Sequence, residues 1–162
     1  HVFGDLAVSG SGEVLQNWEE LKRKEKHQET AADSVDSVAR SLPGLWRAEK
    51  IQKKARKAGF DWPDVSGALD KLSEEVEELR TAVAEGSNIQ EELGDLLFAA
   101  VKVGRFLGLD SELALHAACE KFIRRFRRTE ELAGQPMTQM ELSDLERFWA
   151  QAKRDSDSTS MT

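Results

Sequence analysis

The chain has 162 residues, a net charge of −7, 40% apolar and 33% charged residues, no Tyr and three Pro. This length fits one domain with appendages or two small ones, and the composition favours helices over sheet. The negative charge argues against a nucleic-acid partner, and the single Cys119 excludes an intramolecular disulfide. No apolar run approaches the roughly 20 residues of a membrane span, and no signal peptide is visible, so we expect a cytoplasmic protein.

Apolar periodicity predicts helices along most of the chain. These helices are expected at residues 13–29, 43–58, 65–84, 89–108, 111–132 and 138–153. Residues 1–12 are expected to form a loop, 30–41 a linker or frayed segment, and 154–162 a disordered tail. Phe60 and Trp62, in the connection before the third helix, are expected to close the end of a helical core.

The third and fourth helices are expected to be antiparallel neighbours, because only residues 85–88 join them. Both contain apolar residues at the alternating spacing of a core-facing stripe. The stripes are Leu69, Leu72, Val76, Leu79 and Val83 in the third helix, and Leu93, Leu96, Leu97, Ala100 and Gly104 in the fourth. Burial of both stripes is therefore predicted.

Each of these two helices carries a pair of carboxylates three residues apart, Glu75/Glu78 and Glu92/Asp95. Residues at i and i+3 share a helix face, so packing would bring four carboxylates together. Like charges repel unless a cation neutralises them or some protonate, and oxygen ligands in this number suit Mg²⁺ or Mn²⁺. Glu75 and Glu78 also lack a Lys or Arg at i+4, which a helix stabilised by surface ion pairs would more often supply. A solvated acidic face stays open as the alternative.

The fifth helix carries a basic run at residues 121–128. Lys121, Arg125 and Arg128 share one face at i, i+4 and i+7, which suits phosphate oxygens. The alternative is a solvated helix end, where cations interact favourably with the helix dipole. The sequence contains no Glu-x-x-His pair, P-loop Lys or Gly-rich phosphate cradle, which argues against a ferritin-like di-iron bundle and a P-loop enzyme.

Together these motifs resemble the MazG family of nucleoside triphosphate pyrophosphohydrolases. The resemblance rests on KLSEEVEEL, EELGDLLFAAVKVGRFLG and EKFIRRF, on the upstream LPGLWRAEKIQKKARKAGFDWPD, and on HVFGD with the helix that follows it. It implies that the chain is the C-terminal, catalytic half of a two-domain protein. Residues 1–42 would then be a linker and helix leading from an upstream domain, and 43–153 the catalytic domain.

The resemblance implies an all-α fold of four-helix type, with an extra helix at each end, assembled as a homodimer or higher homo-oligomer. It also implies Mg²⁺-dependent hydrolysis of an NTP or dNTP to the monophosphate and pyrophosphate. Two other functions stay open. One is a non-catalytic helical dimerisation module, and the other is a pyrophosphohydrolase of the same fold that acts on a phosphoribosyl metabolite or an alarmone.

The spacing argument and the resemblance point to the same site residues. Metal ligands are expected at Glu75, Glu78, Glu92 and Asp95. Glu74 or Glu75 is expected to accept the proton of the attacking water. Lys121 and Arg125 are expected to neutralise phosphate charge, and the resemblance suggests Trp149 as a base-stacking residue, although amphipathic packing explains that Trp as well.

Overall fold

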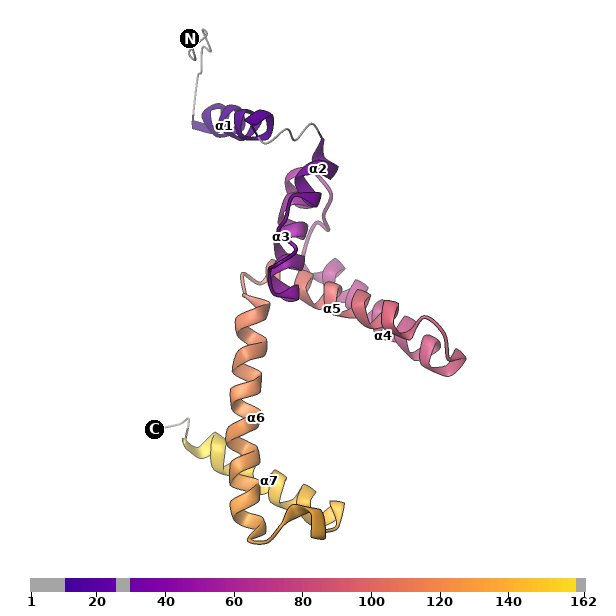
Figure 1. The fold of residues 1–162 in the computed structure, drawn as a ribbon, viewed down its shortest axis with the longest axis vertical. Coiled ribbons are helices and arrows are strands. Elements are labelled where there is room, and N and C mark those ends of the chain that lie inside the picture. The colour runs from indigo at the N-terminus through magenta and orange to yellow at the C-terminus, as the bar shows by residue number, and fades with distance from the viewer. Residues whose placement is uncertain (1–10, 26–29, 160–162) are drawn as a thin grey trace. The chain divides into compact units, whose positions relative to one another are not determined.

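The computed structural model describes residues 11–25 and 30–159. All regular elements in these ranges are helices and none is a strand, so the predicted all-α class is confirmed. The helices form two compact units, divided between Leu109 and Asp110 (Figure 1). The predicted catalytic segment 43–153 therefore includes parts of both units.

The first unit is built around a long antiparallel pair of helices. Its described helices are α1 (Ser11–Glu25), α2 (Ala31–Asp36), α3 (Gly44–Lys57), α4 (Val65–Glu85) and α5 (Ile89–Phe106). Helices α4 and α5 pack along each other, α3 packs on α5, and α2 packs on α3 (Figure 1). Lys57 of α3 also forms a 2.9 Å ion pair with Glu19 of α1.

The second unit is a helical pair. It contains α6 (Ser111–Ala133), a 3₁₀ turn η1 (Met137–Gln139) and α7 (Leu142–Thr159), and α6 packs against α7. Across the described residues of both units, no helix has the length and apolar character needed to cross a bilayer.

The ends of the α4–α5 hairpin follow from local chemistry. The Asp64 side chain accepts a 3.1 Å hydrogen bond from the Gly67 N–H and so caps the start of α4. Gly86 ends α4 with φ at 70°, a left-handed conformation that glycine adopts without a Cβ penalty. Asn88 follows at φ 58° and begins α5. The predicted antiparallel pair with a turn at 85–88 is confirmed.

The expected linker at 30–41 is wrong in its first half, where α2 forms. The Asp33 N–H donates to the Thr30 hydroxyl oxygen at 3.1 Å, and the Thr30 N–H donates to the Asp33 carboxylate at 3.0 Å. This reciprocal pair is a capping box, which satisfies two backbone donors at the start of α2. Val38, just beyond the helix, is buried. Small polar residues here begin a helix instead of forming a linker.

The last helix also differs from its prediction. Thr138 lies in η1, so α7 begins later, at Leu142. It then continues to Thr159, through residues that were predicted to be disordered. Asp155 in this stretch accepts a 2.8 Å hydrogen bond from Arg128 of α6, which ties the end of α7 to its neighbour. The predicted loop at 1–12 is wrong at its last two residues, because α1 begins at Ser11. The rest of that loop, the helix end at 26–29 and residues 160–162 lie outside the described residues.

Most of the predicted apolar stripe is not buried within one chain. Leu72, Val76, Leu79 and Leu96 are half-buried, whereas Leu69, Val83, Leu93 and Leu97 are exposed. The reason is that a two-helix hairpin has a single internal seam, and residues away from that seam stay accessible. Phe60 is 74% exposed, so the expectation that it closes the core is also wrong.

A buried polar network joins α3, α5 and the connection before α4. Arg105 donates two hydrogen bonds to the Asp61 carboxylate, both of 2.8 Å, and its Nε donates to the Gln52 side-chain oxygen at 3.3 Å. Gln52 in turn donates to the Phe98 carbonyl oxygen at 2.9 Å. The Arg105 side chain is only 4% exposed, which is tolerable because its charge is paired and hydrogen-bonded. Hydrogen bonding to Arg105 lowers the pKa of Asp61.

Trp62 is fixed in the same region. The Lys102 ammonium lies 4.1 Å from the centroid of its ring, a cation–π contact, and burial lowers the pKa of Lys102. A Cβ atom at position 67 would clash with the Trp62 ring, so Gly67 permits the ring to approach the first turn of α4. The aromatic connection is thereby held against the helix that carries Glu75.

We predict that Asp61→Asn lowers the free energy of unfolding by about 2 kcal/mol at pH 7, because it leaves the buried Arg105 charge without its partner. The folded-state pKa of Asp61 lies below its ordinary value of 3.8. The stability that the pair contributes is therefore complete above that pH and lost below it, so the difference between the proteins narrows in acid. Urea unfolding of both proteins between pH 3 and 7 measures this difference in the free energy of unfolding.

The matched control is Asp36→Asn, which removes an exposed ion pair with Arg40 of the same 2.8 Å length. That change is expected to lower the free energy of unfolding by no more than about 0.5 kcal/mol. Equal losses for the two variants would show that the Arg105–Asp61 pair has no special role in stability.

Candidate metal centre

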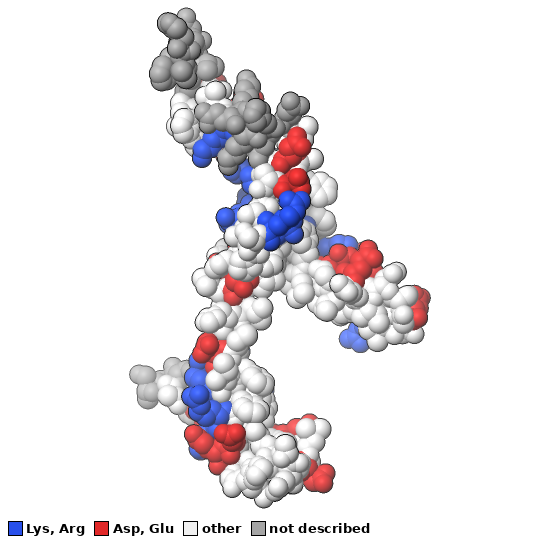
Figure 2. All heavy atoms as spheres, in the orientation of Figure 1, with Lys and Arg blue, Asp and Glu red and all other residues white. Residues whose placement is uncertain are grey.

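The α4–α5 hairpin brings three of the four predicted metal ligands together. One carboxylate oxygen from each of Glu75, Glu92 and Asp95 lies within 4.8 Å of the others. Glu75 comes from the middle of α4, and the other two share one face of the first turns of α5. Figure 2 shows acidic side chains gathered over this hairpin.

Two oxygens of this three-carboxylate group are buried without a hydrogen-bond partner, Oε2 of Glu75 and Oε2 of Glu92. The Glu75 side chain is only 6% exposed, so water does little to stabilise its charge. A buried ion without a partner is costly, and a cation would satisfy both oxygens at once. A set of carboxylate oxygens with no nitrogen or sulfur donor fits a hard divalent ion such as Mg²⁺ or Mn²⁺.

Lys71, one turn before Glu75 on α4, contacts the group directly. Its ammonium lies 2.8 Å from Oε1 of Glu75 and 3.2 Å from Oε2 of Glu74. Hydrogen bonds to Glu75 and Glu74 raise the pKa of Lys71. The i+4 positions of Glu75 and Glu78 hold no cation, but Lys71 lies at i−4 from Glu75 and was not predicted as its partner. The spacing rule that applies to i+4 pairs applies equally to i−4 pairs, so this contact of Lys71 could be predicted from the sequence.

The remaining acidic residues of α4 lie at the margin. Glu78 is exposed and stands outside the three-carboxylate group, but hydrogen bonding with Glu75 and its negative charge raise the pKa of Glu78. Glu74 is also exposed and contacts only Lys71 among the described ion pairs. An open pocket of about 310 Å³ adjoins the group and is lined in part by Glu74, Glu78 and Glu92.

The predicted phosphate residues belong to the second unit. Lys121 is exposed on α6, whereas the Arg125 side chain is only 16% exposed and its Nε is buried without a hydrogen-bond partner. The nearest carboxylate is that of Asp157, 3.5 Å from the Arg125 guanidinium. A pocket of about 430 Å³, lined in part by Arg124 and Arg125, opens beside it.

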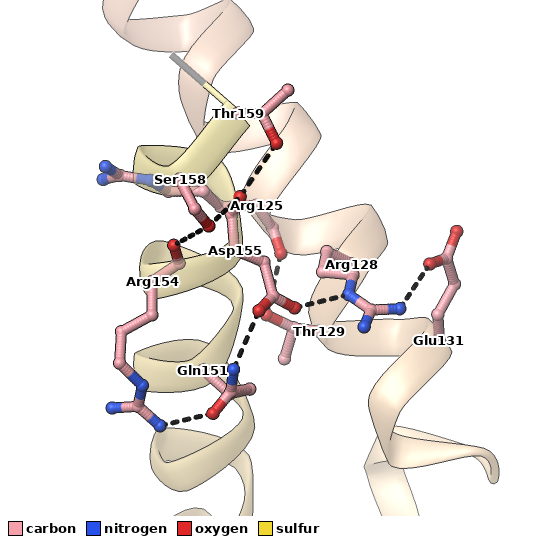
Figure 3. A network of polar contacts seen from close by, with 9 residues as sticks. All are labelled: Arg125, Arg128, Thr129, Glu131, Gln151, Arg154, Asp155, Ser158 and Thr159. Carbon is pink, nitrogen blue, oxygen red and sulfur yellow. Dashed lines mark hydrogen bonds and ion pairs between the residues drawn. The ribbon is translucent and has the colours of Figure 1, made fainter. Parts of the chain in front are cut away.

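Arg128 shares the Arg125 face but is already paired within the unit. Figure 3 shows its guanidinium between Asp155 at 2.8 Å and Glu131 at 3.2 Å. Gln151 donates a further 2.8 Å hydrogen bond to Asp155, and these contacts raise the pKa of Arg128 and lower that of Asp155. Arg128 therefore anchors α7 to α6.

Trp149 lies in an aromatic cluster of the second unit. Its ring centroid is 5.3 Å from that of Phe122, which stacks in turn on Phe126 at 5.9 Å. This contact fits the packing interpretation, and the half-buried ring retains some accessible surface. The roles of Lys121, Arg125 and Trp149 toward the three-carboxylate group stay predictions.

These features define an all-α protein with a candidate divalent-metal centre on a helical hairpin. Residues 64–129 match the family described as the MazG nucleotide pyrophosphohydrolase domain, and this range includes both the three-carboxylate group and Arg125. The resemblance to the MazG family is confirmed by this match and by the relatives described next.

Three relatives extend this match. The chain is 44% identical over 161 residues to the nucleoside triphosphate pyrophosphohydrolase of Escherichia coli strain K12, covering 95% of this chain and 61% of that protein. It is 36% identical over 156 residues to the nucleoside triphosphate pyrophosphohydrolase/pyrophosphatase MazG of Thermotoga maritima, with 94% and 59% covered. It is also 43% identical over 159 residues to Bacillus subtilis YabN, with 94% and 32% covered.

The chain thus spans about 61% of the length of the first of these relatives. These matches do not support the further expectation that the chain is the C-terminal half of a two-domain protein, which stays a prediction.

We predict that Glu92→Gln raises the free energy of unfolding by about 1 kcal/mol in EDTA, because it removes one of three mutually repelling charges. The control is Glu91→Gln, since Glu91 lies in the same first turn of α5 but outside the three-carboxylate group. It is expected to change stability by a few tenths of a kcal/mol in the opposite direction, through the helix dipole. A Glu92→Gln protein less stable than Glu91→Gln in urea unfolding would contradict this account of the group.

Proposed function

We propose that this chain hydrolyses nucleoside triphosphates, NTPs or dNTPs, to the monophosphate and pyrophosphate with Mg²⁺ as cofactor. The observation that carries the proposal is the three-carboxylate group, in which two buried oxygens have no hydrogen-bond partner. The matched family description and the names of the E. coli and T. maritima relatives support the substrate class. Mn²⁺ suits the same donor set.

The carboxylates would divide two tasks. A bound divalent ion would offset the charge of the triphosphate and activate water for attack on phosphorus at the α/β side. Glu75, Glu92 and Asp95 would hold the ion, with Glu78 as a further ligand at the margin. Either Glu75 or Glu74, which lies outside the three-carboxylate group, would accept the proton of the water.

The second unit would bind the substrate. Lys121 and Arg125 would neutralise phosphate charge as it shifts to the leaving pyrophosphate. The mostly buried position of Arg125 supports this role, because a guanidinium held by its surroundings loses little freedom on binding. Trp149 would stack on the base, a contact that discriminates weakly between bases and suits a permissive enzyme.

The assay that tests the proposal supplies each NTP and dNTP with Mg²⁺ and separates the products. We expect monophosphate and pyrophosphate, and we expect Glu75→Gln and Asp95→Asn to lower kcat/KM by about a hundredfold or more, as loss of charge stabilisation in the transition state does elsewhere. Diphosphate and orthophosphate as products would exclude the proposed cleavage site.

The matched control is Glu77→Gln. Glu77 belongs to the same acidic run but is exposed, pairs with Arg80 at 3.3 Å and lies outside the three-carboxylate group. Its turnover is expected to equal that of the wild type. Adding phosphoribosyl pyrophosphates and alarmones to the panel tests the other substrate class, and faster turnover of these would replace the nucleotide assignment.

We also propose that the chain forms a homodimer through the α4–α5 hairpin. Leu69, Leu93 and Leu97 of this hairpin are 46%, 46% and 47% exposed. Full burial of such side chains contributes about 1.5–3 kcal/mol each, so a second copy on this face would gain from covering them. The described part of one chain offers these residues only partial cover.

Light scattering during size-exclusion chromatography is expected to give twice the chain mass of 18.1 kDa. Leu97→Glu is expected to shift the protein to the monomer mass, because it places a charge in the proposed interface. Leu142→Glu, which alters a more exposed leucine at the start of α7, is the control and is expected to leave the mass unchanged. A monomeric wild type would exclude the dimer without touching the metal centre.

A further inference from the structure

One cation is built into the candidate metal centre. Among the ion pairs of residues 11–25 and 30–159, the pair from Lys71 is the only one that reaches Glu75, Glu92 or Asp95. The Lys71 side chain is 34% exposed, and its ammonium lies 2.8 Å from Oε1 of Glu75. It contacts Oε1 of Glu75, while Oε2 of the same carboxylate is buried and unpartnered.

The charges of this arrangement do not balance. Three carboxyl groups each bring one oxygen within 4.8 Å of the others, and one ammonium pairs with only one of these groups. The ammonium also occupies a ligand oxygen of Glu75. A divalent ion bound to Glu75 would stand within a few ångströms of a positive charge, so the two cations must compete.

We propose that Lys71 is the counter-ion of the metal-free centre, and that it gives up Glu75 when a divalent cation binds. Lys71 acts through Glu75 and is a positioning residue. This inference rests on the proposed metal centre and adds to it a residue that controls how tightly the ion is held.

Glu74 gives the displaced ammonium a place to remain. Its carboxylate already lies 3.2 Å from the Lys71 ammonium, and its side chain is 63% exposed, so it can follow the ammonium without losing buried contacts. Lys71 would therefore change from sharing Glu74 and Glu75 to pairing with Glu74 alone. Two adjacent carboxylates on one turn thus serve different partners.

Removing the ammonium should affect the two states differently. Without it the metal-free centre loses the one ion pair that the described residues give it, whereas the metal-bound centre loses a repulsion. Coulomb's law with the full screening of bulk water gives about tenfold tighter binding of Mg²⁺ when a unit charge about 5 Å away is removed, and weaker screening would increase that factor. The rise in Tm on adding Mg²⁺ should grow accordingly.

Calorimetric titration with Mg²⁺ alone, without nucleotide, tests the proposal on the full chain. Lys71→Met and Lys71→Gln are both expected to bind Mg²⁺ about tenfold more tightly than the wild type. Lys71→Arg, which keeps the charge, is expected to bind like the wild type. The matched control is Arg80→Met, which removes a cation from the same helix and breaks its pair with Glu77, outside the three-carboxylate group.

Equal or weaker Mg²⁺ binding by both neutral variants would overturn the inference, as would the same tightening in Arg80→Met. If Lys71→Met failed to fold, the titration of Lys71→Gln would decide, because its amide can still donate a hydrogen bond to Glu75. Absence of Mg²⁺ binding by the wild type would instead overturn the metal centre itself. The two failures are therefore distinguishable.

Discussion

Repulsion between carboxylates held at the α4–α5 seam is the constraint on which the rest of the first unit depends. Three like charges stay close only if the two helices are fixed in rotation and register, since one residue of slip turns a side chain by about 100°. The caps at Asp64 and Gly86, and the left-handed Asn88 that begins α5, set that register locally. The residues at the ends of the hairpin therefore fix a geometry that the repulsion between its carboxylates disfavours.

The polar network around Arg105 supplies the remaining constraint. Buried ion pairs often contribute little net stability, because desolvation offsets their attraction, but their geometry is specific. Arg105 binds Asp61 through two parallel hydrogen bonds, and Asp61 directly precedes Trp62, which lies against Gly67 in the first turn of α4. The network thus links the end of α5 to the start of α4, and both helices carry the carboxylates. Its main contribution is to position the hairpin.

The sequence predicts the long helices well because their signals are local. Apolar residues at helical spacing and residues such as Asp64 and Gly86 place α4 and α5 within a few positions of their ends. The same signals cannot say what covers an apolar face, which is why Leu93 and Leu97 were expected in a core and are exposed. Thr30 shows a second limit, since a small polar residue suits a loop and a helix cap equally.

In each unit, a charged group of the candidate site already has a partner of opposite charge. The three-carboxylate group is balanced in part by Lys71 of its own helix, and Arg125 of α6 has Asp157 of α7 nearby at 3.5 Å. A ligand of either charge therefore has to replace a partner that the unit already provides.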